Sequence, residues 1–368
     1  MAISLNGCSV CGRRFEVQHG FQVQSLHQGV TYYCSQGCHE ADLFKQRRRC
    51  CSQCGKEFDL IYAFQQVSTQ RQVSFFCSTA CRELSKSPAV ALSTRPEPAR
   101  IAILNQKGGT GKTTTAVNLA GGLADAGYSV LLLDLDAQGH VATSLGAKTN
   151  HGIYQLLLEG QAPRMCITQL RKRLHCIVGD ERLANVELWL ANLPNDGRRE
   201  FVLRDRIAPI EAQFDFIIAD CGPAMSLMNI NALTYADWVL TPVSCDFLSL
   251  VGVKQMLRTV KRVNKDLGSK VEILGVIPTF YDRRNRISDE AVKTLKSYFR
   301  DKVLPPIRIN TQLKEAPQHE QTIFEYAPHS RGAADYASLV EAVVSFFPRL
   351  RHTQPPAAPE RVTSVQLS

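Results

Sequence analysis

Apolar residues between positions 100 and 224 come in short runs bounded by polar or glycine-rich segments. RIAIL (100–104), VLLL (130–133) and FIIA (216–219) each have the length of a buried strand. After the first run and a glycine-rich loop, residues 113–127 have a helical pattern. Their apolar residues on or near one face are Ala116, Val117, Leu119, Ala120 and Leu123. The succession of strand, loop and helix predicts an α/β fold with a mostly parallel sheet flanked by helices.

A second helical pattern, over residues 250–265, is amphipathic and basic. Its apolar stripe consists of Leu250, Val253, Leu257, Val260 and Val263. Beside that stripe, basic residues fall at i, i+4, i+7, i+8 and i+11, namely Lys254, Arg258, Lys261, Arg262 and Lys265. More basic residues follow at Arg283, Arg284, Arg286, Lys293, Lys296 and Arg300. The pattern fits a surface that binds a polyanion through its phosphates, and equally a solvated face on a core helix.

The charge of the chain is concentrated rather than evenly spread. The 368 residues carry a formal charge of +9, and residues 250–302 alone hold 13 basic and six acidic side chains. Such a region favours a polyanion or an anionic surface. No apolar run is long enough to span a bilayer, and the first residues show no secretory pattern. We therefore expect a cytoplasmic protein without a membrane partner.

Nine of the 13 cysteines lie in the first 81 residues and form a repeat. The spacing C-x2-C-x22-C-x3-C occurs twice, 43 positions apart. Four thiolates per unit suit a structural tetrahedral Zn2+, with disulfides and an iron–sulfur cluster as the alternatives. The predicted ligands are Cys8, Cys11, Cys34 and Cys38 for the first ion and Cys51, Cys54, Cys77 and Cys81 for the second. Cys50 is a spare thiol, and the histidines of the first unit are not repeated in the second.

The loop after the first strand, NQKGGTGKTTTA (105–116), almost fits the phosphate-loop pattern G-x-x-x-x-G-K-[ST]. Gln106 stands where the first glycine is expected, and Lys107 is an additional lysine. Backbone N–H groups from Gly108 to Thr113 can hold a phosphate at the start of the helix. We expect Lys112 to contact the β- and γ-phosphates and Thr113 to bind Mg2+. The predicted nucleotide contacts are Lys107, Gly108, Gly109, Thr110, Gly111, Lys112, Thr113 and Thr114.

Carboxylates end two of the later strands. Asp134 and Asp136 follow VLLL, and Asp220 follows FIIA. In a parallel sheet these strand ends share the edge at which the loop binds phosphate. We expect Asp220 to hold Mg2+ through water and Asp136 to orient the attacking water, both close to the metal. Asp134 is open between a similar role and a turn or helix cap.

Several of these segments together resemble one protein family. KGGTGKTT resembles the deviant phosphate loop of the ParA/MinD ATPases, and DLDAQGHVATSLG and FDFIIADCGPA resemble their next two motifs. Three later segments resemble the ParA/Soj branch, namely LTPVSCDFLSLVGVKQML, GVIPTFYDRRNRISDE and LKEAPQHEQTIFEYAPHSRGAADY. The resemblance covers roughly residues 100–345 and implies a P-loop ATPase using ATP and Mg2+. It also implies an ATP-dependent homodimer in which Lys107 reaches the partner's ATP, so Lys107, Lys112, Asp136 and Asp220 are the expected catalytic residues.

The chain also departs from the family pattern. Arg308 and Ile309 stand where the family has Pro and Arg beside adenine, and we assign Arg308 and Asn310 to nucleotide binding by this resemblance. Gln312 replaces an arginine that contributes to non-specific DNA binding in ParA/Soj proteins. Other basic residues would have to supply that contact.

The resemblance and the cysteine repeat together predict the domain organisation. Residues 1–85 form a tandem zinc-finger region with four ligand cysteines in each unit (about 6–43 and 49–86). The [FY]-C-S-x-x-C endings of these units resemble treble-clef fingers of the TRASH/MYM type. A proline-containing linker (86–99) leads to the ATPase domain (100–350), and residues 351–368 form a flexible tail.

The leading functional hypothesis is a ParA-type ATPase that partitions or positions a plasmid, chromosome or other cargo and is therefore expected to be nucleoid-associated. Its expected partners are a second copy of the chain, non-specific DNA, and a ParB-like or cargo protein that stimulates hydrolysis. The fingers would contact that partner or DNA. The main alternative is an ATP-switched, zinc-finger transcriptional or metal-responsive regulator, and a metal- or cluster-loading ATPase is another. A membrane-cycling MinD-like protein is disfavoured because residues 352–368 contain three prolines and no apolar stripe.

Overall fold

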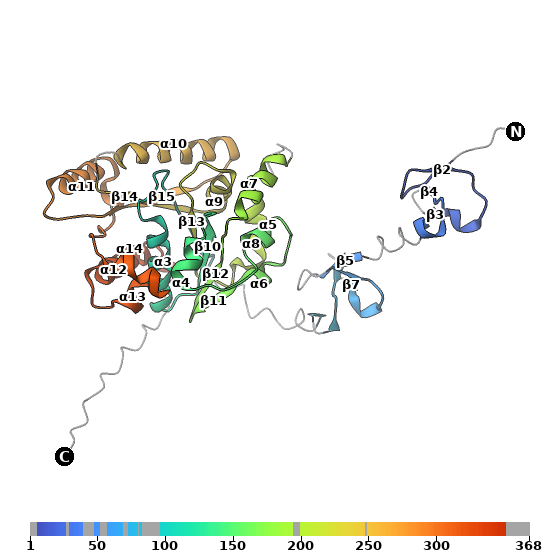
Figure 1. The fold of residues 1–368 in the computed structure, drawn as a ribbon, viewed down its shortest axis with the longest axis horizontal. Coiled ribbons are helices and arrows are strands. Elements are labelled where there is room, and N and C mark those ends of the chain that lie inside the picture. The colour runs from blue at the N-terminus through green and yellow to red at the C-terminus, as the bar shows by residue number, and fades with distance from the viewer. Residues whose placement is uncertain are drawn as a thin grey trace, which may run out of the picture. The chain divides into compact units, whose positions relative to one another are not determined.

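The computed structural model describes residues 6–26, 29–39, 48–51, 57–68, 73–79, 81–82, 96–193, 199–246 and 249–350. The chain divides into two compact units, Met1–Ala91 and Leu92–Ser368, which are shown in Figure 1. The predicted tail and residues 86–95 of the predicted linker lie outside the described residues.

The N-terminal unit contains the same small motif twice. In the first copy, β1 (Asn6–Gly7) pairs with β2 (Arg14–Phe15), and β3 (Val23–Leu26) pairs with β4 (Gly29–Tyr32). In the second copy, β5 (Arg48–Cys50) pairs with β6 (Glu57–Asp59), and β7 (Gln66–Ser68) pairs with β8 (Val73–Phe75). All four pairs are antiparallel. The 3-10 turns η1 (Gly20–Gln22) and η2 (Ala63–Gln65) occupy corresponding places.

A buried glutamine organises each copy. The Gln22 Oε1 atom accepts hydrogen bonds from the backbone N–H groups of Gln18 and His19 at 2.7 and 2.8 Å. Gln65, 43 positions later, accepts the equivalent bonds from Ile61 and Tyr62 at the same two distances. Because such a buried amide fixes two backbone donors at once, it holds the turn in one conformation. The duplication seen in the cysteines therefore extends to the internal hydrogen bonds.

The C-terminal unit is built on a seven-stranded sheet with the order β11-β12-β10-β13-β9-β14-β15. Its strands are β9 (Ala99–Ile103), β10 (Val130–Leu135), β11 (Thr168–Arg171), β12 (Leu174–Ile177), β13 (Phe216–Cys221), β14 (Trp238–Ser244) and β15 (Glu272–Thr279). All neighbours are parallel except the edge pair β11–β12. The expectation of a mostly parallel sheet is confirmed.

Helices cover both faces of this sheet. Their bounds are α3 (Lys112–Asp125), α4 (His140–Leu145), α5 (Ile153–Leu157), α6 (Pro163–Cys166), α7 (Leu183–Asn192), α8 (Val202–Glu211), α9 (Leu227–Tyr235), α10 (Ser249–Leu267), α11 (Arg286–Phe299), α12 (Gln312–Glu315), α13 (Ile323–Tyr326) and α14 (Arg331–Phe346). Short 3-10 helices are η4 (Arg300–Lys302), η5 (Ala316–His319) and η6 (Pro348–Leu350).

Alternate residues of the central strands face two separate cores. Ile101 and Ile103 of β9 pack in the core shared with α3, α4, α13 and α14. Ala102 of the same strand packs in the core shared with α5 to α10. A strand buried on both faces is apolar over most of its length, which is why the sequence shows continuous apolar runs there.

The two amphipathic predictions can be compared with the observed burial. The predicted apolar face of α3 is entirely buried. In α10, Val253, Val260 and Val263 are buried, and all five predicted basic side chains are exposed. The side chain of Leu250 lies outside the described residues. No helix in the described part of the chain is long and apolar enough to cross a membrane.

Candidate active site and cysteine clusters

The glycine-rich loop joins β9 to the first residue of α3. Gly109 and Gly111 have φ values of 70° and 85°, a left-handed conformation that glycine adopts without steric cost. Gly111 is the N-cap of α3, so Lys112 begins the helix directly. The Thr110 carbonyl accepts a buried 2.9 Å hydrogen bond from the Thr279 hydroxyl at the end of β15. The loop therefore presents its backbone N–H groups at a helix N-terminus, which suits a phosphate.

The first half of the loop is attached to neighbouring elements by side chains. Gln106, in place of the usual glycine, has a negative φ and donates from Nε2 to the Thr259 hydroxyl of α10 at 2.9 Å. Asn105 donates to the Pro242 carbonyl of β14 at 2.7 Å and accepts from the Lys107 N–H at 3.0 Å. No backbone requirement for glycine exists at position 106. The side chain found there links the phosphate loop to the basic helix.

The two lysines of the loop have different surroundings. Lys112 is buried, and its ammonium donates to the Lys107 carbonyl at 3.1 Å. Burial lowers the pKa of Lys112, while the carboxylates of Asp220 and Asp136 oppose that shift. Lys107 is about one-third exposed, and its ammonium lies 2.8 and 3.0 Å from the two carboxylate oxygens of Asp246. Lys112 thus lies beside the carboxylates at the strand ends, whereas Lys107 forms its ion pair with a different carboxylate, that of Asp246.

The sheet register brings Asp220 to the loop. Asp220 is level with Asp134 on β10 and with Ile103, the last residue of β9. It is fully buried, and neither carboxylate oxygen has a hydrogen bond of normal geometry from a described residue, although the Thr113 hydroxyl lies close enough to lower its pKa. Burial and the nearby Asp134 carboxylate raise its pKa well above the usual range, and Lys112 opposes the shift. A buried carboxylate without a donor, beside the loop hydroxyl of Thr113, fits the oxygen ligands that Mg2+ prefers.

The aspartates at the end of β10 have separate roles: Asp134 lies within the strand and Asp136 directly follows it. Asp134 is buried and accepts from the backbone N–H groups of Asp136 and Val141, each at 3.3 Å. Burial raises the pKa of Asp134 to about 7. Its contacts make it the cap of the turn, which answers the question that the sequence left open. Asp136 is partly exposed, and it lines a cavity of about 550 Å3 together with Gly222.

This turn is tightly enclosed by glycines. A Cβ atom added to Gly179 would lie 2.5 Å from the Asp134 carbonyl and 3.0 Å from the Asp136 carbonyl. One added to Gly139 would lie 2.9 Å from the Gly179 carbonyl. Because these distances to backbone atoms are below normal contact, neither position accepts a side chain without movement of the turn.

A second cavity, of about 360 Å3, lies on the other side of the loop. It is lined by Gly111 from the loop, by Thr114 from the first turn of α3, and by Arg308 and Asn310, the residues assigned to the nucleotide. The four are therefore brought together. Arg308 is also bound to Asp335 of α14, by its N–H at 2.9 Å and by its Nε at 3.0 Å. This carboxylate raises the pKa of Arg308, so the charge of the guanidinium is already compensated.

Sequence reasoning did not identify four contacts of this site. Thr259, Asp246, Thr279 and Asp335 hold the loop or the cavity wall, but each lies far along the chain from its partner. Asp246, Thr279 and Asp335 lie within the later motifs that resemble the family, which is the one signal that pointed towards them, whereas Thr259 lies outside those motifs.

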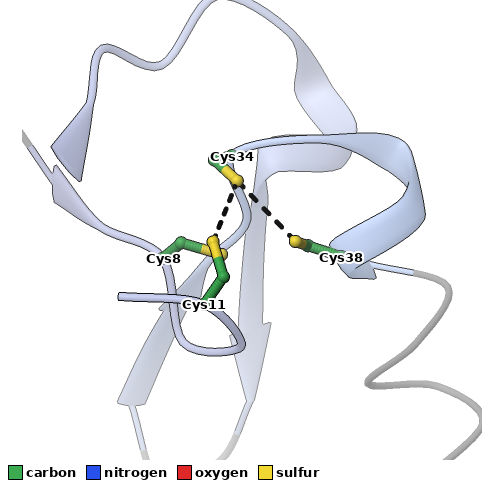
Figure 2. Close-up of side chains that lie close together, drawn as sticks. All are labelled: Cys8, Cys11, Cys34 and Cys38. Carbon is green, nitrogen blue, oxygen red and sulfur yellow. Dashed lines mark hydrogen bonds between the residues drawn. The ribbon is translucent and has the colours of Figure 1, made fainter. Parts of the chain in front are cut away.

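The N-terminal cysteines form two clusters. In the first, shown in Figure 2, the Cys34 Sγ atom lies 3.4 Å from that of Cys11 and 3.7 Å from that of Cys38. The four Sγ atoms, including that of Cys8, all lie within 4.8 Å of one another. Zn–S bonds of about 2.3 Å in a tetrahedron place sulfurs roughly 3.8 Å apart, whereas a disulfide requires about 2.05 Å. The cluster fits a zinc ion and does not fit a disulfide.

The second cluster has the same geometry as far as it is described. Cys51, Cys77 and Cys81 lie within the same limits, and the last two Sγ atoms are 3.6 Å apart. The fourth predicted ligand, Cys54, lies outside the described residues. The three thiols are arranged as in the first cluster, which is consistent with a second metal site.

Comparison with known proteins places the C-terminal unit in a family. Residues 99–273 match the family model of an AAA domain. The chain is 37% identical over 253 residues to the chromosome partitioning protein ParA of Caulobacter vibrioides, covering 67% of this chain and 93% of that protein. It is 39% identical over 250 residues to the sporulation initiation inhibitor protein Soj of Bacillus subtilis, covering 67% and 98% respectively.

Solved structures agree with this placement. Cobyrinic acid a,c-diamide synthase from Mycobacterium smegmatis, with bound ADP and magnesium, matches with a TM-score of 0.59 and 29% identity, over 69% of this chain and 97% of that one. Apo McdA of Cyanothece matches with a TM-score of 0.61 and 24% identity, over 67% and 99%, and shares the fold. With the phosphate loop and strand-end carboxylates in place, the chain is an ATPase and belongs to the ParA/Soj family of partition proteins.

Proposed function

We propose that this chain is a partition or positioning ATPase that dimerises on ATP, binds DNA as a dimer, and releases it when a partner protein stimulates hydrolysis. The observation that carries the proposal is the position of the two lysines in the phosphate loop. One is buried beside the carboxylates, and the other is partly exposed with its ammonium on Asp246. The first serves the chain's own nucleotide, and the second is available to a nucleotide held by another copy.

Within one chain, the loop would hold ATP through its backbone N–H groups and Lys112. Thr113 and Asp220 would hold Mg2+, with Asp136 close by. When bound, the metal neutralises charge on the phosphate oxygens. Asp136, partly exposed beside a cavity, would orient the water that attacks the γ-phosphate. Arg308 and Asn310 would lie along the nucleoside, with Thr114 at the entrance to their cavity.

Lys107 would couple this site to dimerisation. Its ion pair with Asp246 is about one-third to one-half exposed, and such pairs contribute roughly 0–1 kcal/mol. A triphosphate carries more negative charge than the Asp246 carboxylate, so Lys107 can exchange this ion pair for a contact with a triphosphate at little cost in free energy. Loss of the γ-phosphate on hydrolysis would return Lys107 to Asp246 and weaken the dimer.

The surface proposed for DNA is the exposed basic face of α10. Arg262 is paired with Asp266 at 3.2 Å, which leaves Lys254, Arg258, Lys261 and Lys265 as the stronger candidates. Such a surface binds phosphates without sequence preference and with a steep salt dependence. Through Thr259, this helix is bonded to Gln106, so a change in the phosphate loop has a direct route to the basic face.

The cysteine clusters would hold two structural zinc ions, one in each copy of the motif. Because a motif of about 40 residues has little core, the metal would supply most of its stability. The relatives ParA and Soj are matched over nearly their whole length by the ATPase part alone. The duplicated fingers are therefore an addition to that part, and we propose that they dock the partner or cargo, with DNA contact as the second possibility.

The test is DNA binding by the purified chain on a non-specific duplex, with ATP, ADP or no nucleotide, at two salt concentrations. Lys107→Ala is compared with Lys172→Ala, an exposed lysine in the turn between β11 and β12. A chain lacking residues 1–90 completes the set. The expected result is ATP-dependent, salt-sensitive binding that needs Lys107, does not need Lys172 and survives loss of the fingers. Binding that ignores nucleotide and disappears with the fingers would refute the proposal and favour the zinc-finger regulator.

A further inference from the structure

Phe280, directly after β15, has an unusual backbone conformation. Its φ is 52°, in the left-handed region that bulky side chains rarely occupy. A conformation of this kind costs roughly 1–3 kcal/mol, and it persists where the surroundings impose it, often at functional sites. The side chain is 38% exposed, so burial of the ring in a core does not explain the conformation.

Backbone hydrogen bonds on both sides of Phe280 impose this conformation. The Ile307 N–H donates to the Pro278 carbonyl at 2.8 Å, and the Tyr281 N–H donates to the Ile307 carbonyl at 3.0 Å. The Ile309 N–H then donates to the Tyr281 carbonyl at 3.1 Å. The segment 278–281 is thereby fastened along 307–309, and residue 280 must turn its side chain out of this ladder.

The ring that is turned out lies at the phosphate loop. A Cβ atom built on Gly111 would be 3.9 Å from the Cζ atom of Phe280, which is van der Waals contact. The ring lines the 360 Å3 cavity together with Ile309, which is 55% exposed. Two large apolar side chains are thus exposed at one cavity, next to the N-terminus of α3.

Two basic residues line this cavity, Arg308 and the exposed Lys314, whereas the wall beside Phe280 and Ile309 is apolar and includes Ile307, Leu313 and Pro317. The Arg308 guanidinium is compensated by Asp335, and Asn310 uses its side-chain oxygen to accept from the Gln312 N–H at 2.8 Å. What is left is an apolar slot beside a phosphate-binding loop, with an aromatic ring at its edge. A flat heteroaromatic group attached to phosphates has the matching chemistry.

We propose that Phe280 is a specificity-determining residue that stacks on the base of the bound nucleotide, with Ile309 forming part of the same slot. This inference rests on the nucleotide site proposed above and adds the residue that selects a nucleoside over a bare polyphosphate. Because every base has a π-face, stacking selects for a base without distinguishing adenine from guanine. The positive φ of Phe280 is the conformational cost of placing its ring at the edge of this cavity.

The alternative is that the ring only covers Gly111 and supports the loop. The two roles differ in what they do to a ligand without a base. Removing a stacking residue weakens the binding of nucleotides and leaves the binding of inorganic tripolyphosphate unchanged. Removing a support of the loop weakens the binding of both ligands, because both are held by the loop. They also differ in stability, because glycine removes the strain at a positive φ.

The experiment uses the full chain with Mg2+ and calorimetric titration of a non-hydrolysable ATP analogue, the equivalent GTP analogue and tripolyphosphate. The variants are Phe280→Ala, Phe280→Tyr and Phe280→Gly, with Tyr298→Ala as a control, since Tyr298 is an aromatic residue 66% exposed on α11. We expect Phe280→Ala to weaken both nucleotide analogues roughly tenfold or more and by similar factors. Tripolyphosphate binding should change less than about twofold, and Phe280→Tyr should bind as the wild type does.

Phe280→Gly should lose the same nucleotide affinity without a decrease in Tm, because the strain is relieved. Two results would overturn the proposal in favour of a loop support. One is an equal loss of affinity for tripolyphosphate and for the ATP analogue in Phe280→Ala. The other is a decrease in the Tm of Phe280→Gly together with its loss of nucleotide affinity. Unchanged nucleotide affinity in Phe280→Ala would overturn it outright. Absence of ATP-dependent DNA binding in the wild type would refute the proposed function and leave the base-stacking result to be judged by itself.

Discussion

Replacing Gln106 by glycine restores the ordinary phosphate-loop pattern, and the structure predicts that this change makes the protein less stable. Gln106 occupies its position with a negative φ, so the backbone gains nothing from glycine. The change removes the 2.9 Å hydrogen bond to Thr259 that attaches the loop to α10. It also adds conformational freedom to the unfolded chain.

The size of the effect follows from these two terms. A partly buried side-chain hydrogen bond contributes about 0.5–1.5 kcal/mol, and glycine in place of a residue with ordinary φ costs about 0.5–1 kcal/mol more. The free energy of unfolding of the C-terminal unit should therefore fall by roughly 1–2.5 kcal/mol. For a unit of this size, each kcal/mol lowers Tm by about 2–4 °C.

Tryptophan fluorescence during urea unfolding measures this unit alone, because the only two tryptophans, Trp189 and Trp238, both lie in it. Thr259→Val, which keeps the side-chain volume and removes the hydroxyl, completes a double-mutant cycle with Gln106→Gly. We expect a coupling energy of about 1 kcal/mol. Additive effects of the two substitutions, or a Gln106→Gly variant as stable as the wild type, would show that the hydrogen bond does not hold the loop.

Three further outcomes are expected. Lys107→Ala should abolish ATP-dependent dimerisation in sedimentation velocity while changing stability by less than about 1 kcal/mol, because its pair with Asp246 is partly exposed. Cys34→Ser should reduce bound zinc, measured by mass spectrometry, by one ion per chain, whereas Cys50→Ser should leave it unchanged. Asp134 has a pKa raised on folding from 3.8 to about 7, so the stability it contributes is complete below pH 4 and is lost as pH rises towards 7. In chemical denaturation, the stability of Asp134→Asn relative to the wild type should therefore increase as pH rises from 4 to 7, and identical slopes of stability against pH would contradict this.

The parts of this fold that could be predicted from the sequence are those set by local patterns. Apolar runs identified β9, β10 and β13, because a strand buried on both faces is apolar over most of its length. The glycines of the phosphate loop and the aspartates after the strands could be located for a similar reason, since each requirement is met within a few neighbouring residues. The α/β class followed from their order.

The contacts that hold the site together could not be predicted in the same way. Gln106 and Thr259 are 153 positions apart, and Lys107 and Asp246 are 139 positions apart. Nothing in either local sequence specifies the other, because the pairing depends on how α10 and β14 pack beside the loop. Asp134 illustrates the same limit at short range. From the sequence, a carboxylate at a strand end can be either a metal ligand or a cap. For Asp134, only its burial and its two N–H donors distinguish these roles.

The glycine-lined turn after β10 has a consequence for the timing of the cycle. With Gly139 and Gly179 packed against its backbone, the turn that carries Asp136 is closely enclosed. Under the proposed function, the carboxylate that orients the attacking water would then be in position before the nucleotide binds. The lifetime of the ATP form would accordingly be set by what a partner protein adds to the site, and not by a rearrangement of this turn.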